Sequence, residues 1–169
     1  NHDYGVIADG GIQATGTQIV ETLVLPAREI AKLLASDGAF GDTFGNNVAI
    51  NGSIAVVGAR YNRDFGNRSG SAYIFERDEG GPENWGQVAK LLPSNGGAVQ
   101  IFGTSVAASG NTVIVGSNNG AYIYERNEGG SDSWGEVQIL LPNDIVMGDA
   151  FGEHVAIYGL SLIHISEPT

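Results

Sequence analysis

The chain has 169 residues, enough for one ordinary domain with a buried core, and 42% of them are hydrophobic, which excludes a disordered chain. Its formal net charge of −11 excludes a general nucleic-acid binder, because such proteins neutralise phosphates with Lys and Arg. The chain has no cysteine, so it forms neither disulfides nor thiolate metal sites, and no apolar run is long enough for a membrane span.

Glycine makes up 26 residues and proline only 5, a balance that predicts many tight turns between short strands. The first residues, 1–27, show no clear copy of the repeat that follows them, so we expect a lead-in segment or a degenerate partial blade. Within it, residues 18–25 suit either a strand or a short helix. Because the chain does not begin with methionine, we expect a processed chain or, as the repeat count favours, a fragment.

Four strand-like segments begin within the first repeat unit, residues 28–88. They are residues 47–50, 54–57, 72–76 and 87–92. The Asn51-Gly52 pair after the first segment predicts a two-residue hairpin turn with positive φ angles. The second segment is apolar on both faces, which is typical of a strand buried on both sides, and the third carries aromatic residues on one side.

The connection between the second and third segments is long and rich in arginine. Three of the 8 basic residues of the chain lie in it, interleaved with aromatic residues. The candidate binding residues are Arg60, Tyr61, Arg63, Phe65 and Arg68. Arginine and aromatic side chains anchor many binding interfaces, and loops carry function on rigid scaffolds. The alternative is an ordinary solvated connection whose arginines offset nearby acidic residues.

A second unit, residues 89–137, repeats the first in register. Trp85 and Trp134 lie 49 residues apart, as do Phe102 and Phe151, and the arginine-rich connection accounts for the difference of nine residues between the units. We expect the Phe and Gly positions of the repeat to be turns and packing points of each unit's first hairpin. We expect the two tryptophans to be packing residues. These positions are Phe44, Gly45, Gly58, Phe102, Gly103, Gly116, Phe151, Gly152, Trp85 and Trp134. Four short strands in units of about 49–58 residues predict an all-β fold of β-propeller blades, each of four antiparallel strands.

The Phe44-Gly45 and Gly58-Ala59 pairs resemble the two halves of the FG-GAP repeat, known from the integrin α-chain propeller. Longer runs resemble the bacterial-type FG-GAP repeats of secreted and surface proteins. They are AKLLASDGAFGDTFG at 31–45, GSAYIFER at 70–77 and NEGGSDSWGEV at 127–137. The resemblance covers roughly residues 28–159 and implies a β-propeller whose blades serve recognition or scaffolding outside the cytoplasm.

A third unit starts at residues 138–159 and then leaves the pattern, because Ile165 stands where the first two units have Gly58 and Gly116. Residues 160–169 resemble the translation of sequencing-adapter DNA, and we expect a non-repeat, artefactual tail; a diverged last strand is the alternative. A closed propeller needs about four to eight blades. The sequence therefore predicts an incomplete propeller, a fragment whose partners include further blades of the same parent chain.

The sequence does not favour a metal site. Integrin-type repeats place acidic residues between the Phe-Gly and the Gly-Ala, but here the interval reads NNVAINGSIAVV, without a carboxylate. Because calcium prefers about six to eight oxygen ligands, we expect no calcium there, and we expect no other metal or cofactor. Asp37 and Asp42, which precede the Phe-Gly, are interpreted as turn residues that bond backbone N–H groups, with a ligand role as the alternative.

No set of residues suited to catalysis converges in the sequence, so we expect no catalytic residue. The sequence predicts a non-enzymatic module of a larger secreted or cell-surface protein, for recognition of a protein or glycan ligand or for scaffolding. The extracellular or cell-surface location follows from the family resemblance. Two alternatives stay open: the propeller portion of an extracellular enzyme such as a polysaccharide-degrading enzyme, and calcium-dependent adhesion in the integrin manner.

Overall fold

The structure is a computed structural model that describes residues 29–144 and 150–159. The lead-in expected at residues 1–27 and the tail expected at 160–169 lie outside the described residues. Every regular element within the described ranges is a β-strand, and these strands belong to one compact unit that starts at Ala31. The all-β fold predicted from the sequence is confirmed.

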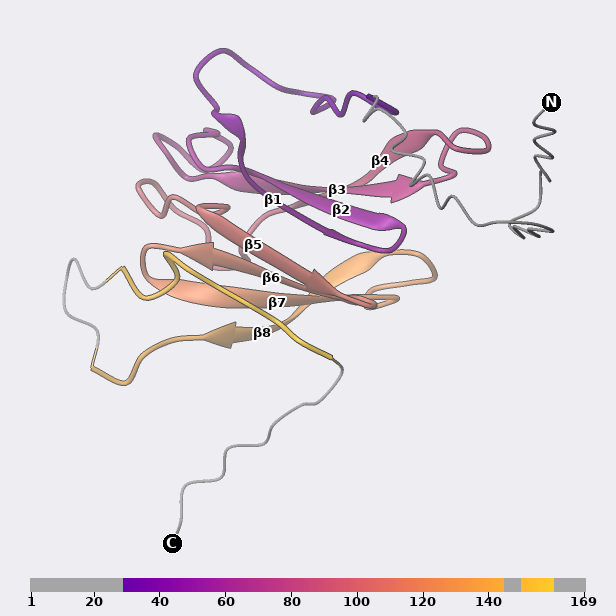
Figure 1. The fold of residues 1–169 in the computed structure, drawn as a ribbon. Coiled ribbons are helices and arrows are strands. Elements are labelled where there is room, and N and C mark those ends of the chain that lie inside the picture. Colours follow the sequence, from indigo (N-terminus) through magenta and orange to yellow (C-terminus); the bar gives the residue numbers. More distant parts are fainter. Residues whose placement is uncertain (1–28, 145–149, 160–169) are drawn as a thin grey trace, which may run out of the picture. The chain divides into compact units, whose positions relative to one another are not determined.

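Each repeat unit builds one antiparallel sheet of four strands that follow one another in chain order (Figure 1). The strands of the first sheet are β1 (Phe44–Asn51), β2 (Ile54–Ala59), β3 (Ser71–Arg77) and β4 (Trp85–Leu91). Those of the second sheet are β5 (Ser105–Ser109), β6 (Thr112–Ser117), β7 (Gly120–Arg126) and β8 (Trp134–Leu140). We refer to the two sheets as the first and the second blade, and they confirm the predicted blades of four antiparallel strands.

The second strand of the first blade is buried on both of its faces, as its continuous apolar sequence predicted. Side chains alternate between the faces of a strand, so Val56 points into one core and Val57 into another. Tyr73 and Phe75 on β3 share the face of Val57, which confirms that the aromatic residues of this strand lie on one side.

The hairpin turn between β1 and β2 differs from the prediction by one residue. Asn51 pairs with Ile54 at the end of the ladder, so the two turn residues are Gly52 and Ser53. Gly52 has a φ of 58°, a left-handed value that glycine adopts without the strain that a Cβ would cause. Gly110 takes the same place in the second blade with a φ of 56°. The positive φ therefore belongs to the glycine, and Asn51 completes β1.

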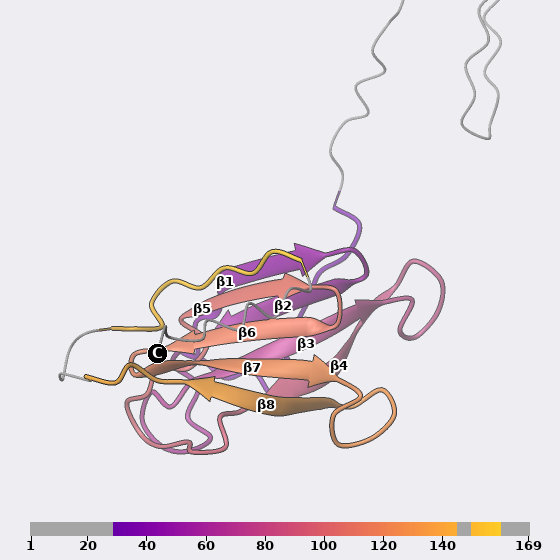
Figure 2. The ribbon, with the colours of Figure 1, turned by 90° about the horizontal axis from the view of Figure 1, so that it is seen from below.

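The two blades pack face to face on a shared hydrophobic core (Figures 1 and 2). The core contains Ile54, Val56, Ala72, Ile74 and Leu91 of the first blade, with Phe102, Val106, Val113, Val115, Tyr122 and Tyr124 of the second unit. Phe102 is fully buried, and its ring meets the rings of Tyr122 and Tyr124 edge-on, with centroids 5.2 and 6.2 Å apart. Such T-shaped pairs are favourable beyond the area that they bury.

The long connections of both units gather at one end of the two blades, at the left in Figures 1 and 2. Residues 60–70 join β2 to β3, and residues 92–104 join β4 to β5. The two connections contact each other through their backbones, since the Val99 N–H donates to the Asn67 carbonyl at 2.8 Å. The turns between β1 and β2, β3 and β4, β5 and β6, and β7 and β8 lie at the opposite end (Figure 1). We call the end with the long connections the loop end.

Candidate functional site

The glycines of the repeat meet between blades. A Cβ on Gly58 in the first blade would collide with the carbonyl of Gly103 in the second unit, and one on Gly103 would collide with the carbonyl of Ser71. Gly116 has the same relation to Gly152 at the start of the third unit. These glycines are packing points between neighbouring units, because the backbone of the next unit occupies the space of the missing side chain.

The stretch that would hold calcium in an integrin-type repeat links the two blades instead. Asn47 Oδ1 accepts a hydrogen bond from the Val106 N–H, and Asn51 Oδ1 accepts one from the Gly110 N–H, both at 3.0 Å. The amide oxygens of Asn47 and Asn51 are thus engaged by the backbone of β5 and its turn. Within residues 29–144 and 150–159, no group of three or more acidic or histidine side chains is placed to hold a metal ion.

Near the end opposite the loop end, a carboxylate of the first blade joins two donors of the second. Glu76 on β3 accepts hydrogen bonds from Arg126 at 2.7 Å and from the Trp134 indole N–H at 3.2 Å. Trp134 also packs against the core that the blades share, whereas Trp85 packs against the other face of the first blade. Both tryptophans therefore contribute to packing at equivalent places.

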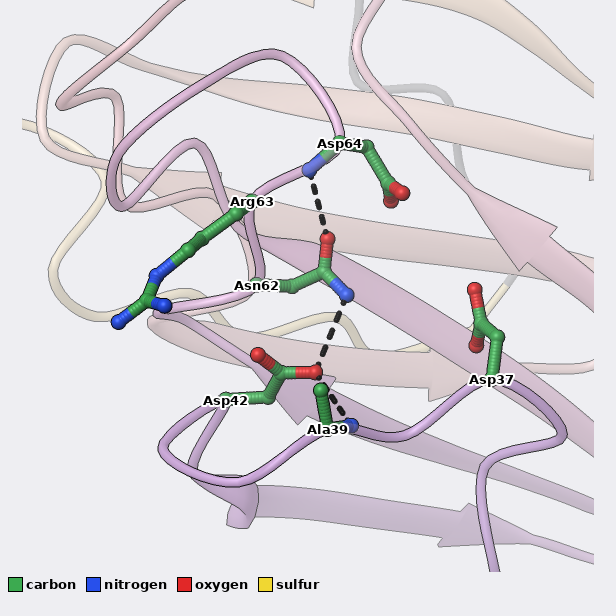
Figure 3. A pocket seen from close by; sticks show the side chains of 6 residues that line it. All are labelled: Asp37, Ala39, Asp42, Asn62, Arg63 and Asp64. Atoms are coloured by element: carbon green, nitrogen blue, oxygen red, sulfur yellow. Dashed lines mark hydrogen bonds between the residues drawn. The ribbon is translucent and has the colours of Figure 1, made fainter.

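An open pocket of about 270 Å³ lies at the loop end (Figure 3). It is lined by Asp37, Ala39, Asp42, Asn62, Arg63 and Asp64. The buried Asp42 carboxylate accepts the Ala39 N–H at 2.9 Å, which confirms a turn role for this residue, and it also accepts the Asn62 amide at 3.4 Å. Asn62 Oδ1 in turn accepts the Asp64 N–H at 3.0 Å. These bonds hold the start of the long loop against the segment that precedes β1.

A lysine that the sequence analysis did not single out joins the acids of this pocket. The Lys90 ammonium forms ion pairs with both Asp37 and Asp64, and the Tyr73 hydroxyl donates to Asp37 at 2.9 Å. The hydrogen bond from Lys90 lowers the pKa of the Asp37 carboxyl, whereas burial, together with the bond to Asp37, raises the pKa of Tyr73 to about 12. Asp37 lies in a turn, as the sequence predicted, and it is in addition an ion-pair partner of Lys90, a role that the sequence did not predict.

The second blade keeps the tyrosine contact of this pocket but not its charges. The Tyr122 hydroxyl donates to Asn95 Oδ1 at 2.9 Å, at the places that Tyr73 and Asp37 take in the first blade. Ile139 stands where the first blade has a lysine. A blade therefore forms without the ion pairs. The charged residues of the first blade could have been found in the sequence, because uncharged residues stand at the equivalent positions of the second unit.

Three of the five candidate binding residues form one cluster on the long loop. The guanidinium carbons of Arg60 and Arg68 lie over the Tyr61 ring, 4.7 and 4.9 Å from its centroid. Each contact is a cation–π interaction, which contributes about 0.5–1 kcal/mol at an exposed site. We call Arg60, Tyr61 and Arg68 the arginine cluster.

The other two candidates lie apart from the cluster. Phe65 packs over Gly96 in the neighbouring connection, where a Cβ would collide with its ring, so this aromatic residue helps to join the two long connections. Arg63 lines the pocket, but its guanidinium is turned away from the carboxylates of Asp37 and Asp64 (Figure 3). The predicted binding surface is thus divided into a cluster, a packing residue and a pocket residue.

Comparisons with known proteins identify the repeat. A family model described as FG-GAP repeat matches residues 27–75 and 85–132. Searches of the curated proteins and of the solved structures found no match. Within the part of the chain that the structure describes, no helix has the length and hydrophobicity to span a membrane.

Proposed function

Because this chain belongs to the FG-GAP repeat family, we propose that its blades form part of a non-enzymatic recognition or scaffolding module of a larger secreted or cell-surface protein. The packed blades supply a rigid frame. The loop end supplies the surface that contacts a protein or glycan, and further blades of the same parent chain complete the propeller.

The observation that carries this proposal is the long loop of the first blade. The second blade joins β6 to β7 with a short turn between Ser117 and Gly120, so a blade forms without the additional residues. The long loop nevertheless has internal bonds that fix its path: Ser69 Oγ donates to the Asn62 carbonyl and accepts the Phe65 N–H, both at 3.1 Å. A loop that the fold does not require, held in one conformation, suits recognition because little entropy is lost on binding.

The charge of Asp37 does not suit this residue to be the general acid of a glycoside hydrolase. The general acid of a glycoside hydrolase needs a carboxyl group with a raised pKa. The pKa of Asp37 is lowered instead, because its hydrogen bond with Lys90 favours the ionised form. Asp37 is therefore suited to accept hydrogen bonds from a ligand and unsuited to donate a proton to a leaving group.

A loop replacement tests the proposal. In the variant, residues 59–71 are replaced by the four residues of the equivalent connection, SNNG at 117–120. Circular dichroism verifies that the wild-type chain and the variant are folded, and each is then applied to a glycan array. We expect the wild-type chain to bind a subset of the glycans without releasing reducing sugar, and we expect the replacement to abolish binding. An array without binding would contradict glycan recognition, and binding that survives the replacement or release of reducing sugar would contradict the proposal as a whole.

A further inference from the structure

We propose that the arginine cluster and the adjoining pocket together bind an acidic saccharide, a sugar that carries a carboxylate or sulfate group in addition to its hydroxyls. This inference rests on the proposed recognition function and names its ligand class.

The arginine cluster holds positive charges that the described part of the chain does not neutralise. The guanidinium carbons of Arg60 and Arg68 lie 4.7 and 4.9 Å from the same ring centroid, so they are at most about 10 Å apart, which is no more than the Debye length at about 0.1 M salt, and their repulsion is not fully screened. None of the ion pairs within the described residues involves Arg60, Arg63 or Arg68. Arg60 Nε is a buried donor without a hydrogen-bond partner among them. Since buried polar groups normally have partners, an anion from outside the chain would complete this cluster.

The chemistry of the cluster selects the kind of anion. A guanidinium group donates two parallel hydrogen bonds to a planar carboxylate or to a sulfate, and it is less strongly hydrated than an ammonium group. Three of the 8 basic residues of a chain with a net charge of −11 lie in this loop. Because the remainder of the chain is acidic, an anionic ligand is attracted to this loop and repelled elsewhere.

The neighbouring pocket distinguishes a saccharide from an acidic peptide. The Tyr61 N–H donates to the Asp42 carbonyl at 3.2 Å, so the cluster borders the pocket directly. The side chains of Asp37 and Asp64 are 47% and 32% exposed there, and their carboxylates lie on the pocket lining (Figure 3). Carboxylates accept hydrogen bonds from sugar hydroxyls but repel the carboxylates of an acidic peptide. A ligand that bears one acidic group beside several hydroxyls satisfies both parts of the surface.

Calorimetric titration of the whole chain with four polymers tests this inference. Polygalacturonate offers carboxylates with hydroxyls, heparin adds sulfates, dextran is a neutral glycan, and poly-glutamate is an acidic peptide. We expect the wild-type chain to bind polygalacturonate or heparin in preference to the other two, and the preference between these two identifies the acidic group. Arg68→Gln should weaken binding about tenfold or more, the effect of one lost charge-assisted hydrogen bond, and Arg60→Gln should act in the same direction.

Arg77→Gln is the matched control, because Arg77 is ion-paired with Glu83 at the opposite end of the first blade. Equal weakening by Arg77→Gln would show unspecific attraction and overturn the site. Tighter binding of poly-glutamate would assign the cluster to an acidic protein and overturn the saccharide. Binding of dextran that the arginine substitutions leave unchanged would overturn this inference while the recognition function stands. Absence of binding to all four polymers would also overturn it, and the glycan array then decides the proposed function separately.

Discussion

Substitution of Gly58 by alanine tests how the blades are joined. In the structure, a Cβ built on Gly58 would lie 2.1 Å from the carbonyl oxygen of Gly103. A carbon–oxygen contact normally has a separation of roughly 3.3–3.6 Å, so the two blades would have to separate locally by more than about 1 Å. The obstacle is backbone, which cannot rotate aside as a side chain could.

The expected loss of stability follows from this geometry. Overpacking of a tight core costs about 1–3 kcal/mol, and a rigid backbone neighbour places Gly58→Ala near the upper limit, at about 3 kcal/mol. For a chain of this size, such a loss lowers the melting temperature by about 6–12 °C. The φ of Gly58 is not in the left-handed region, so the loss would report the contact and not backbone strain.

Urea unfolding followed by circular dichroism measures the effect, and Gly97→Ala is the matched control. A Cβ on Gly97 meets nothing within 4 Å, and this glycine also has no left-handed φ. The control should change the free energy of unfolding by less than about 0.5 kcal/mol. If Gly58→Ala were no more destabilising than Gly97→Ala, the reasoning that the repeat glycines join neighbouring blades would be refuted.

Three further predictions concern the contacts around this interface and the pocket. Glu76→Ala should lower the free energy of unfolding in urea by about 2 kcal/mol, because it removes the acceptor of Arg126 and Trp134. The control Glu125→Ala, at the equivalent place in the second blade, should lower it by less than about 0.5 kcal/mol. Equal losses would contradict the contact. Added calcium should leave the melting temperature at its value in chelator, since the amide oxygens of Asn47 and Asn51 are engaged by the backbone of the second blade, and a clear rise would contradict this. An unfolded tyrosine ionises near pH 10 and folded Tyr73 at about 12, so its raised pKa stabilises the fold below pH 10 and this contribution is lost as the pH rises to 12. The urea midpoint should therefore fall more steeply over this pH range in the wild type than in Tyr73→Phe, and parallel curves would contradict the assignment.

The strands could be predicted because each one is specified by nearby residues. The apolar run at Ile54, the glycine of the preceding hairpin turn and the aromatic residues of β3 all lie within one unit, and the second unit repeats them. Strand neighbours in chain order need no long-range information. The residues of the turn between β1 and β2 differed from the prediction by one position. The reason is that the glycine of an Asn-Gly pair is compatible with two turn types, which place it differently in the turn.

The contacts between units and within the pocket could not be predicted in the same way. Gly58 meets Gly103 across the blade interface, and Lys90 reaches Asp37 from 53 residues away, so both contacts depend on how the sheets and loops pack. The long loop was recognised as a candidate from its arginines. Which of them would stack on Tyr61 depends on the loop's path, which residues of the neighbouring connection help to fix.

Amide chemical-shift mapping tests the central claim, recognition by the loop end, most directly. The isotope-labelled chain would be titrated with an oligosaccharide of polygalacturonate or of heparin, whichever polymer binds more tightly, while its amide resonances are followed by NMR. We predict that the shifts concentrate on residues 60–70 and on the segment around Asp42, and that the turns at 78–84 and 127–133 stay unchanged. Shifts confined to those opposite turns, or no shifts at saturating ligand, would contradict the account.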